Sequence, residues 1–284
     1  MGWIDAAAMD ATPALRVISK HGVGVDNIDL EAAAERGIPV LVATGANAMS
    51  VAEHAIALML AVVKRILPLD AGLRAGRWEK PGFIGRALAD ATLGLMGMGA
   101  IAQGTGAIAR GLGLRIIGHD PFADQAVFAT AGIERRAGFH DLLTESEVLS
   151  LRCPLTQQTR GILDARAIAV MLRGAYVINT ARGGLIDEAA LLEAIRTGHV
   201  AGAGLDTFAV EPPAEDHPFW SEPRIVATPH VGGVTREAGA RVGVEAVRGI
   251  IDLLEGRPLP PTRIANRALL QGAAETAPTL GQSA

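Results

Sequence analysis

Only one of the 284 residues is a cysteine, Cys153, so no disulfide can form within the chain. Neither this cysteine nor any of the 7 histidines falls at the spacing of a zinc site, and we expect no structural metal. Chains without disulfides are typical of reducing compartments. We therefore expect a cytoplasmic protein.

Long apolar runs and an excess of positive charge are also missing. The longest apolar run, Ala55 to Val63, is too short to span a bilayer and ends at Lys64 and Arg65. No basic segment precedes an apolar run at the start of the chain, so a secretory signal is not evident. The formal net charge of -4 gives no positive field that would attract nucleic acid or anionic membranes. These absences favour a small-molecule ligand over nucleic acid or membrane.

What the chain does contain is an alternation of short β-branched strands with amphipathic helices, which predicts βαβ units and the α/β class. The length is enough for one large or two medium domains. Strands are predicted at Arg16–Ser19, Pro39–Val42, Thr92–Met96, Leu114–His119, Val148–Leu151, Tyr176–Asn179, Ala201–Leu205 and Arg224–Ala227. Helices are predicted at Leu30–Arg36, Ser50–Val63, Ala100–Gly111, Ala165–Leu172, Glu188–Thr197 and Thr235–Glu255.

A glycine-rich motif, Gly97-Met98-Gly99-Ala100-Ile101-Ala102, lies between a predicted apolar strand and a predicted helix. It matches the G-x-G-x-x-[GA] pattern in the context that dinucleotide binding requires. Gly97 would allow the tight turn, and Gly99 would let the backbone approach a pyrophosphate. The phosphates would then lie at the helix N-terminus, beside Ala100 and Ile101.

A carboxylate, Asp120, ends the next predicted strand about twenty residues beyond the glycines, where it would accept hydrogen bonds from the ribose hydroxyls. A 2'-phosphate there would meet like charge, which favours NAD over NADP. Glycine turns alone are common in loops, so the assignment depends on the whole strand, turn, helix and acid pattern. Gly104 and Gly106 fit the predicted helix less well, since each glycine inside a helix lowers its stability by up to about 1 kcal/mol relative to alanine. Close packing of the helix on the sheet is a candidate explanation.

Polar segments follow three later strands, and parallel strands bring such segments to one edge of a sheet. Together with the glycine motif and several shorter stretches, they resemble the D-isomer-specific 2-hydroxyacid dehydrogenase family, which includes D-3-phosphoglycerate, hydroxypyruvate and D-lactate dehydrogenases. The resemblance runs from about Leu15 to Pro258. It is carried by Lys20–Asp29, Ser50–His54, Pro154–Thr159, Asn179–Gly184, Leu205–Pro212 and Thr228–Gly233.

The resemblance implies a catalytic set. Arg182 would clamp the substrate's carboxylate and keto oxygen with its planar, permanently charged fork. His230 would be the general acid in reduction and the base in oxidation, and Glu211 would stabilise its imidazolium form. Without the resemblance, Arg182 would be interpreted as a solvated charge in a loop, and Glu211 as an exposed acidic residue before two prolines. Five other histidines are interpreted as structural or solvated, namely His21, His54, His140, His199 and His217.

The resemblance also implies cofactor and substrate contacts. Asp206 would bind the nicotinamide amide, with a strand-end cap as the alternative. Cys153 and Pro154 would line the adenine side, although buried packing explains the thiol equally well. The backbone amides of Val23 and Gly24 would form an anion nest for the substrate carboxylate. Further cofactor contacts are expected at Thr159, Thr180, Ala181, His230, Gly232 and Gly233.

The expected organisation has three parts. Residues 1-46 would form part of a flavodoxin-like substrate domain, 47-234 a doubly wound Rossmann NAD-binding domain, and 235-284 a C-terminal helix and tail that return to the substrate domain. Family members normally carry roughly fifty more residues ahead of Leu15. A truncated gene, a misassigned start codon and an expressed fragment stay open as explanations. We expect an uncovered edge on the substrate-domain sheet and a partly frayed tail from Pro258 onward.

The predicted activity is hydride transfer between the nicotinamide of NAD and C2 of a D-2-hydroxy or 2-keto acid, of the phosphoglycerate or hydroxypyruvate type. An NAD-sensing protein similar to the family's transcriptional co-repressors and an inactive truncated homologue are the alternatives. The helix Ser50–Val63 with its extension to Trp78 resembles the family's dimer arm. A two-fold homodimer is therefore expected.

Overall fold

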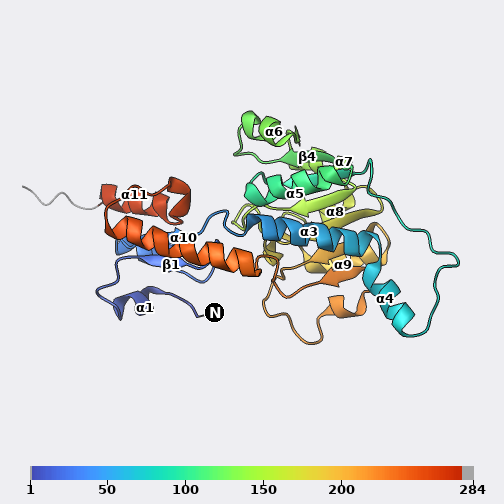
Figure 1. Ribbon diagram of the computed structural model, residues 1–284, viewed down its shortest axis with the longest axis horizontal. Coiled ribbons are helices and arrows are strands. Elements are labelled where there is room, and N and C mark those ends of the chain that lie inside the picture. Colours follow the sequence, from blue (N-terminus) through green and yellow to red (C-terminus); the bar gives the residue numbers. More distant parts are fainter. Residues whose placement is uncertain (1, 277–284) are drawn as a thin grey trace, which may run out of the picture. The chain divides into compact units, whose positions relative to one another are not determined.

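The computed structural model describes residues 2–276 and divides the chain into two compact units (Figure 1). The larger unit is Ala48–Gly233, and the smaller unit joins Met1–Asn47 to Val234–Ala284. A seven-stranded parallel sheet forms the centre of the larger unit, in the order β5-β4-β3-β6-β7-β8-β9. This confirms the predicted α/β class. The strands are β3 (Thr92–Met96), β4 (Arg115–His119), β5 (Glu134–Arg135), β6 (Val148–Leu151), β7 (Ala175–Asn179), β8 (Val200–Leu205) and β9 (Ile225–Ala227).

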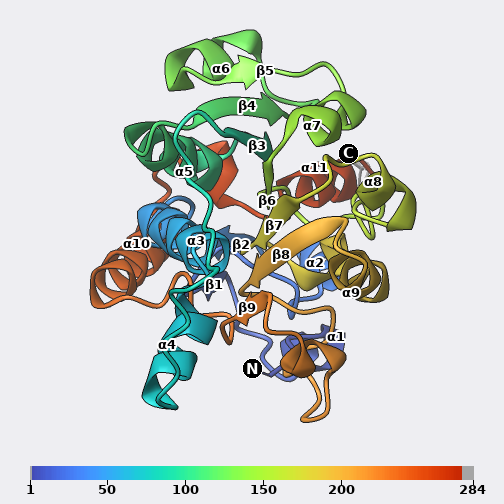
Figure 2. The same ribbon diagram turned by 90° about the vertical axis from the view of Figure 1, so that its right-hand side faces the viewer.

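Helices cover both faces of this sheet, as a doubly wound fold requires (Figure 2). One face packs against α3 (Ala48–Val63) and α5 (Ala100–Gly111). The other packs against α7 (Phe139–Glu145), α8 (Ala165–Ala169) and α9 (Glu188–Arg196). The remaining helices of the larger unit are α4 (Ile66–Arg74), α6 (Gln125–Ala131), η1 (Gly183–Leu185) and η2 (Pro218–Ser221).

The strand order reverses at the centre of the sheet. From β3 the chain builds outward through β4 and β5, and then returns to add β6 on the other side of β3. The carboxyl ends of β3 and β6 are therefore the switch point of the sheet, which is the position where α/β proteins bind their ligands. The glycine motif follows β3 at this position.

Glycines bring helix α3 close to the sheet. A Cβ on Gly204 of β8 would lie 2.9 Å from the Cβ of Leu58 in α3, and one on Gly202 would lie 2.8 Å from Val62. The two helices on this face also meet through a glycine, because a Cβ on Gly104 of α5 would lie 3.2 Å from that of Ala52. Close packing of α5 on α3 thus explains why α5 contains Gly104.

We expect Gly204→Ala to lower the free energy of unfolding by about 1–3 kcal/mol, because the added methyl overlaps Leu58 and forces α3 away from the sheet. Chemical denaturation followed by circular dichroism measures this. Gly111→Ala is the control, since a Cβ there meets nothing within 4 Å. Equal stability of the two variants would contradict the packing account.

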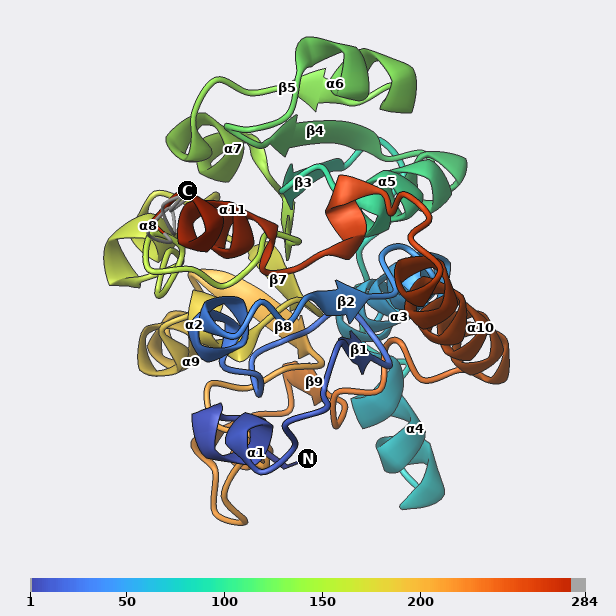
Figure 3. The same cartoon turned by 90° about the vertical axis from the view of Figure 1, so that its left-hand side faces the viewer.

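The smaller unit contains a parallel pair of strands, β1 (Ile18–Lys20) and β2 (Val40–Val42), with helices packed around it (Figure 3). The long helix α10 packs on both strands, and α11 packs on α2. Several of these helices begin at Asp or Thr caps. The helices of this unit are α1 (Ala6–Asp10), α2 (Leu30–Glu35), α10 (Arg236–Leu254), η3 (Pro261–Arg263) and α11 (Arg267–Thr276).

The structure bears on two expectations for this unit. The outer edge of β2 is covered, because Ile264 forms an antiparallel bridge with Leu41 and buried Asn266 accepts a hydrogen bond from the Val40 amide at 2.9 Å, whereas within residues 2–276 no strand pairs with the outer edge of β1. The tail after Pro258 is ordered further than the sequence suggested, because η3 and α11 form within it. The reason is that tertiary contacts, which local apolar periodicity does not report, hold this segment. The last eight residues of the tail lie outside the described residues.

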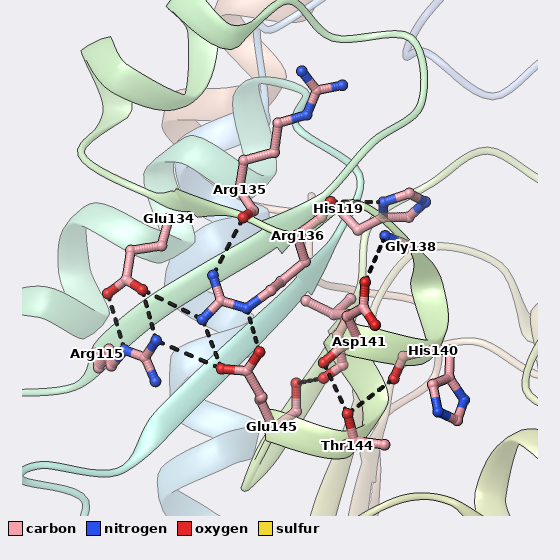
Figure 4. A network of polar contacts seen from close by, with 12 residues as sticks. Arg115, His119, Glu134, Arg135, Arg136, Gly138, His140, Asp141, Thr144 and Glu145 are labelled. Atoms are coloured by element: carbon pink, nitrogen blue, oxygen red, sulfur yellow. Dashed lines mark hydrogen bonds and ion pairs between the residues drawn. The ribbon is translucent and has the colours of Figure 1, made fainter.

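Arginine–carboxylate pairs join the edge of the large sheet to α7 (Figure 4). Arg115 on β4 and Arg136 after β5 both contact Glu134, and Arg136 also binds Glu145 of α7. Hydrogen bonds from these two arginines lower the pKa of Glu134 to about 2. The guanidinium of Arg136 is bound by the carboxylates of Glu134 and Glu145, and only the backbone carbonyl of Arg136 lies next to His119 at the end of β4.

Candidate active site

The turn after β3 has the shape that a dinucleotide requires. Gly97 has a φ of 102°, and a Cβ there would lie 3.0 Å from the backbone of Arg152 and Cys153, so only glycine fits. Gly99 begins α5 without a side-chain cap, and a Cβ on it would meet nothing within 4 Å. No internal contact requires a glycine at this position. The open backbone and the uncapped N–H groups fit a pyrophosphate.

Asp120 lies beside this turn, directly after β4. One carboxylate oxygen accepts a hydrogen bond from the Met98 amide at 2.9 Å, and the other accepts one from the Phe122 amide at 2.9 Å. The side chain is thus fixed next to the glycine motif, as ribose binding would need. His119 donates through Nδ1 to the carbonyl oxygen of Arg136 at 3.1 Å.

The loop after β6 uses its predicted residues mainly for its own structure. Cys153 is buried, and burial raises the pKa of its thiol to about 11, so the buried-packing interpretation fits this side chain. The Thr159 hydroxyl accepts from the Thr156 amide and donates to the Pro154 carbonyl, both at 2.7 Å. These two bonds close the loop, so a cofactor contact by that hydroxyl stays a prediction.

Buried Asn179 shapes the loop that carries Arg182. Its Oδ1 accepts from the Ala181 amide at 3.0 Å, and its Nδ2 donates to the Arg182 carbonyl at 2.9 Å. A Cβ on Gly183 would lie 1.8 Å from the backbone carbon of Phe208, so this loop packs directly against the loop after β8. Asn179 was not predicted as a site residue, although its place at a strand end beside Thr180 is a signal in the sequence that indicates this role.

Glu211 and His230 come from different loops and meet in the structure. The His230 Nδ1 lies 2.7 Å from Glu211 Oε2, and Glu211 Oε1 accepts from the Phe208 amide at 3.0 Å. Because a carboxylate only accepts, Nδ1 carries the proton in this pair, which leaves Nε2 for a ligand. The His230 side chain is 46% exposed, so the imidazole is accessible to a ligand.

The backbone of His230 is held in an uncommon conformation. Its φ of 54° lies in the left-handed region, and its amide donates to the Thr228 carbonyl at 3.0 Å. Strained residues of this kind persist only where surrounding bonds enforce them. Asp206 supplies these bonds, because its carboxylate accepts hydrogen bonds from the Val231 amide at 2.9 Å and the Gly232 amide at 2.8 Å.

Asp206 is the centre of a buried polar cluster and is only 1% exposed. Besides the two amides, it accepts from the Thr228 hydroxyl at 2.6 Å. That hydroxyl also lies 2.9 Å from Nε2 of His54 on α3. Since the Thr228 proton goes to Asp206, His54 must donate through Nε2. His54, interpreted from the sequence as structural or solvated, is structural and belongs to this cluster.

Other predicted residues lie in the loops described. Arg182 donates through Nη1 to the Ala181 carbonyl at 2.7 Å. Thr180 accepts a hydrogen bond from the Arg152 guanidinium. The Gly232 amide is committed to Asp206, so any cofactor contact there would use other atoms. Val23 and Gly24 lie in the smaller unit, in the loop after β1, where Gly22 has a φ of 138°.

Two kinds of feature are absent from the part of the chain that the structure describes. No group of three or more His, Cys, Asp or Glu side chains could hold a metal ion. No helix within residues 2–276 is both long and apolar enough to cross a membrane.

The strand order, the glycine turn and the carboxylate after β4 together define a dinucleotide-binding domain of the Rossmann class. Residues 56–232 match the family described as D-isomer specific 2-hydroxyacid dehydrogenase, NAD binding domain. The chain belongs to this family, and its cofactor is NAD.

Named relatives agree with this assignment. A hydroxypyruvate reductase of Thermotoga maritima is 42% identical over 87% of the chain and 80% of that protein. A D-3-phosphoglycerate dehydrogenase of Mycobacterium leprae is 40% identical over 90% of the chain and 48% of that protein. The solved structure of a glyoxylate reductase from Paecilomyes thermophila superposes with a TM-score of 0.84 at 33% identity, over 91% of this chain and 79% of that one. The chain thus spans about half the length of the phosphoglycerate dehydrogenases that it matches.

We expect Asp206→Asn to lower the free energy of unfolding by about 1–3 kcal/mol, because in either orientation its NH₂ group would face a backbone N–H, that of Val231 or that of Gly232. Urea denaturation measures the loss. Asp124→Asn is the control, because the exposed Asp124 caps α6 without a side-chain hydrogen bond. Similar stability of the two variants would refute the role given to Asp206.

Proposed function

We propose that the protein is an NAD-dependent D-2-hydroxyacid dehydrogenase that interconverts a D-2-hydroxy acid and its 2-keto acid. When bound, the reduced nicotinamide supplies the hydride that reaches C2 of the keto acid. The observation that carries the proposal is the 2.7 Å pair of Glu211 and His230, because it orients a partly exposed imidazole and occupies only one of its two nitrogens. Such a pair is what proton transfer to a keto oxygen needs.

The proton would come from His230. Its Nδ1–H stays bonded to Glu211, and Nε2–H donates to the keto oxygen as C2 is reduced, which leaves the neutral imidazole. In the opposite direction, Nε2 takes the hydroxyl proton, and the Glu211 carboxylate stabilises the imidazolium formed. The Asp206 cluster holds the backbone of this loop, so the imidazole is positioned before substrate arrives.

The remaining chain groups would bind and orient the reactants. Arg182 would hold the substrate carboxylate and keto oxygen. The amides of Val23 and Gly24 are proposed as an anion nest for a carboxylate. We assign the larger unit as the NAD-binding domain and the smaller unit as the substrate-binding domain. Cofactor contacts are proposed along the carboxyl edge of the sheet, at Gly97, Gly99, Ala100, Ile101, Asp120, Cys153, Pro154, Thr159, Thr180, Ala181, Asp206, His230, Gly232 and Gly233.

The substrate class that we propose is a short 2-keto acid of the hydroxypyruvate or phosphohydroxypyruvate type. A hydroxypyruvate reductase and a phosphoglycerate dehydrogenase among the relatives support this choice. Initial rates with each keto acid at fixed NADH rank the candidates. Turnover restricted to long apolar keto acids would refute the class.

We expect His230→Ala to lower kcat by about 10² to 10⁴ while leaving NADH affinity nearly unchanged, because only proton transfer is lost. Stopped-flow turnover and calorimetric NADH titration separate the two quantities. His140→Ala is the matched control, since His140 is exposed on α7. An equal loss of turnover and NADH affinity would remove His230 from the acid–base role.

We expect Asp120→Asn to reduce the preference for NADH over NADPH by about tenfold, since the charge that repels a 2'-phosphate disappears. Asn keeps an oxygen that can accept a hydrogen bond from the Met98 or the Phe122 amide, so the turn is less disturbed than in Asp120→Ala. Competition binding of the two nucleotides measures the ratio. An unchanged ratio would show that another group selects the cofactor.

We also propose a cytoplasmic homodimer assembled through α4 and the segment after it. Large apolar side chains are exposed there, with Leu73 at 59% and Trp78 at 71%. Exposed apolar side chains concentrated in one segment are typical of an interface. Light scattering should give a mass of twice the 29.4 kDa of one chain, and the mass of a monomer would contradict the proposed dimer. Cell fractionation tests the location.

A further inference from the structure

Arg152, the first residue after β6, has a guanidinium that the rest of the described structure does not satisfy. Its Nη1 donates to the Thr180 hydroxyl, but Nε and Nη2 are buried without a hydrogen-bond partner. No carboxylate in the described residues forms an ion pair with it. Burial lowers the pKa of Arg152 to about 9, the direction expected for a cation removed from water without a counterion.

Such a group is costly to the fold. A guanidinium carries five N–H donors in a fixed plane, and a buried charge that lacks partners destabilises the folded state. Buried polar atoms without partners are rare in native proteins and need an explanation, such as a ligand that the structure does not contain. The missing partner of Arg152 must be a negatively charged hydrogen-bond acceptor.

The position of Arg152 indicates which anion this is. Its amide donates to the Met96 carbonyl at the end of β3, at 2.8 Å, and its carbonyl lies 3.0 Å from where a Cβ on Gly97 would be. Arg152 therefore flanks the glycine turn at the point where the strand order reverses. The uncapped N-terminus of α5 follows the same turn, so two separate sources of positive potential adjoin the glycine turn.

We propose that the Arg152 guanidinium binds the diphosphate of the dinucleotide through its unpartnered Nε and Nη2. This inference rests on the proposed function, since it assumes that the dinucleotide binds at the glycine turn. Nε and Nη2 are adjacent donors on one edge of the guanidinium plane, the arrangement that holds phosphate oxygens in pairs. Diphosphate binding would supply the counterion that the fold lacks.

The test compares the natural chain with Arg152→Met and Arg152→Lys by calorimetry against three probes: NADH, ADP-ribose and adenosine. Arg152→Met should bind NADH and ADP-ribose at least tenfold more weakly, with adenosine affinity unchanged because adenosine has no phosphate. Arg152→Lys keeps the positive charge and should therefore lose less affinity for NADH and ADP-ribose than Arg152→Met. Arg173→Met, which removes an exposed arginine from the opposite edge of the sheet, should change none of the three affinities.

Thermal unfolding without ligand gives an independent readout. Because methionine removes an uncompensated buried cation, unliganded Arg152→Met should melt at or above the temperature of the natural chain. The stabilisation that saturating ADP-ribose adds should be smaller than in the natural chain. If Arg152→Met does not fold, Arg152→Gln takes its place in both experiments.

Several outcomes would overturn the inference. Unchanged affinity of Arg152→Met for ADP-ribose would do so. An equal loss of affinity for all three probes together with a lower melting temperature would also do so, because it would indicate that Arg152 has a structural role. Absence of NADH and ADP-ribose binding by the natural chain would instead overturn the proposed function, and this inference with it.

Discussion

The candidate site depends on one buried carboxylate, that of Asp206. It accepts hydrogen bonds from the Thr228 hydroxyl and from the Val231 and Gly232 amides, and these bonds fix the loop in which His230 adopts a left-handed backbone. A buried carboxylate without such partners would be strongly destabilising, so the loop and the carboxylate stabilise each other. His54 on α3 extends the cluster through Thr228 and ties the loop to the helix that covers the sheet.

The parallel sheet explains why these residues meet. All seven strands run in one direction, so the turn after β3 and the loops after β6, β7, β8 and β9 share one edge. Gly204 and Gly202 let α3 pack on β8, which brings His54 within reach of Thr228. Gly183 has the same effect between two loops, because only a residue without a side chain allows the loop of Arg182 to contact the loop of Glu211. Small residues at a few positions therefore set the geometry of the polar ones.

Much of this architecture could be predicted from the sequence, because strands of a buried parallel sheet are short apolar runs. Thr92–Met96 and Val148–Leu151 were predicted to the residue. Helix α6, β5 and helix α11 were not, since their stability comes from packing and ion pairs such as those of Arg136 rather than from local apolar periodicity. His54 was missed as a partner of Asp206 because the two lie far apart in the chain. Arg152 was missed because an unsatisfied guanidinium is a property of three-dimensional surroundings.

The central claim is that the Glu211 and His230 pair performs proton transfer to a 2-keto acid. The most direct measurement follows NADH absorbance with purified protein and hydroxypyruvate, glyoxylate, pyruvate, 2-oxoglutarate or phosphohydroxypyruvate, beside a calorimetric titration of NADH. We expect the protein to bind NADH and to turn over at least one of these acids, and we expect Glu211→Gln and His230→Ala to lose turnover while they retain NADH binding. Tight NADH binding with no turnover of any 2-keto acid would contradict it.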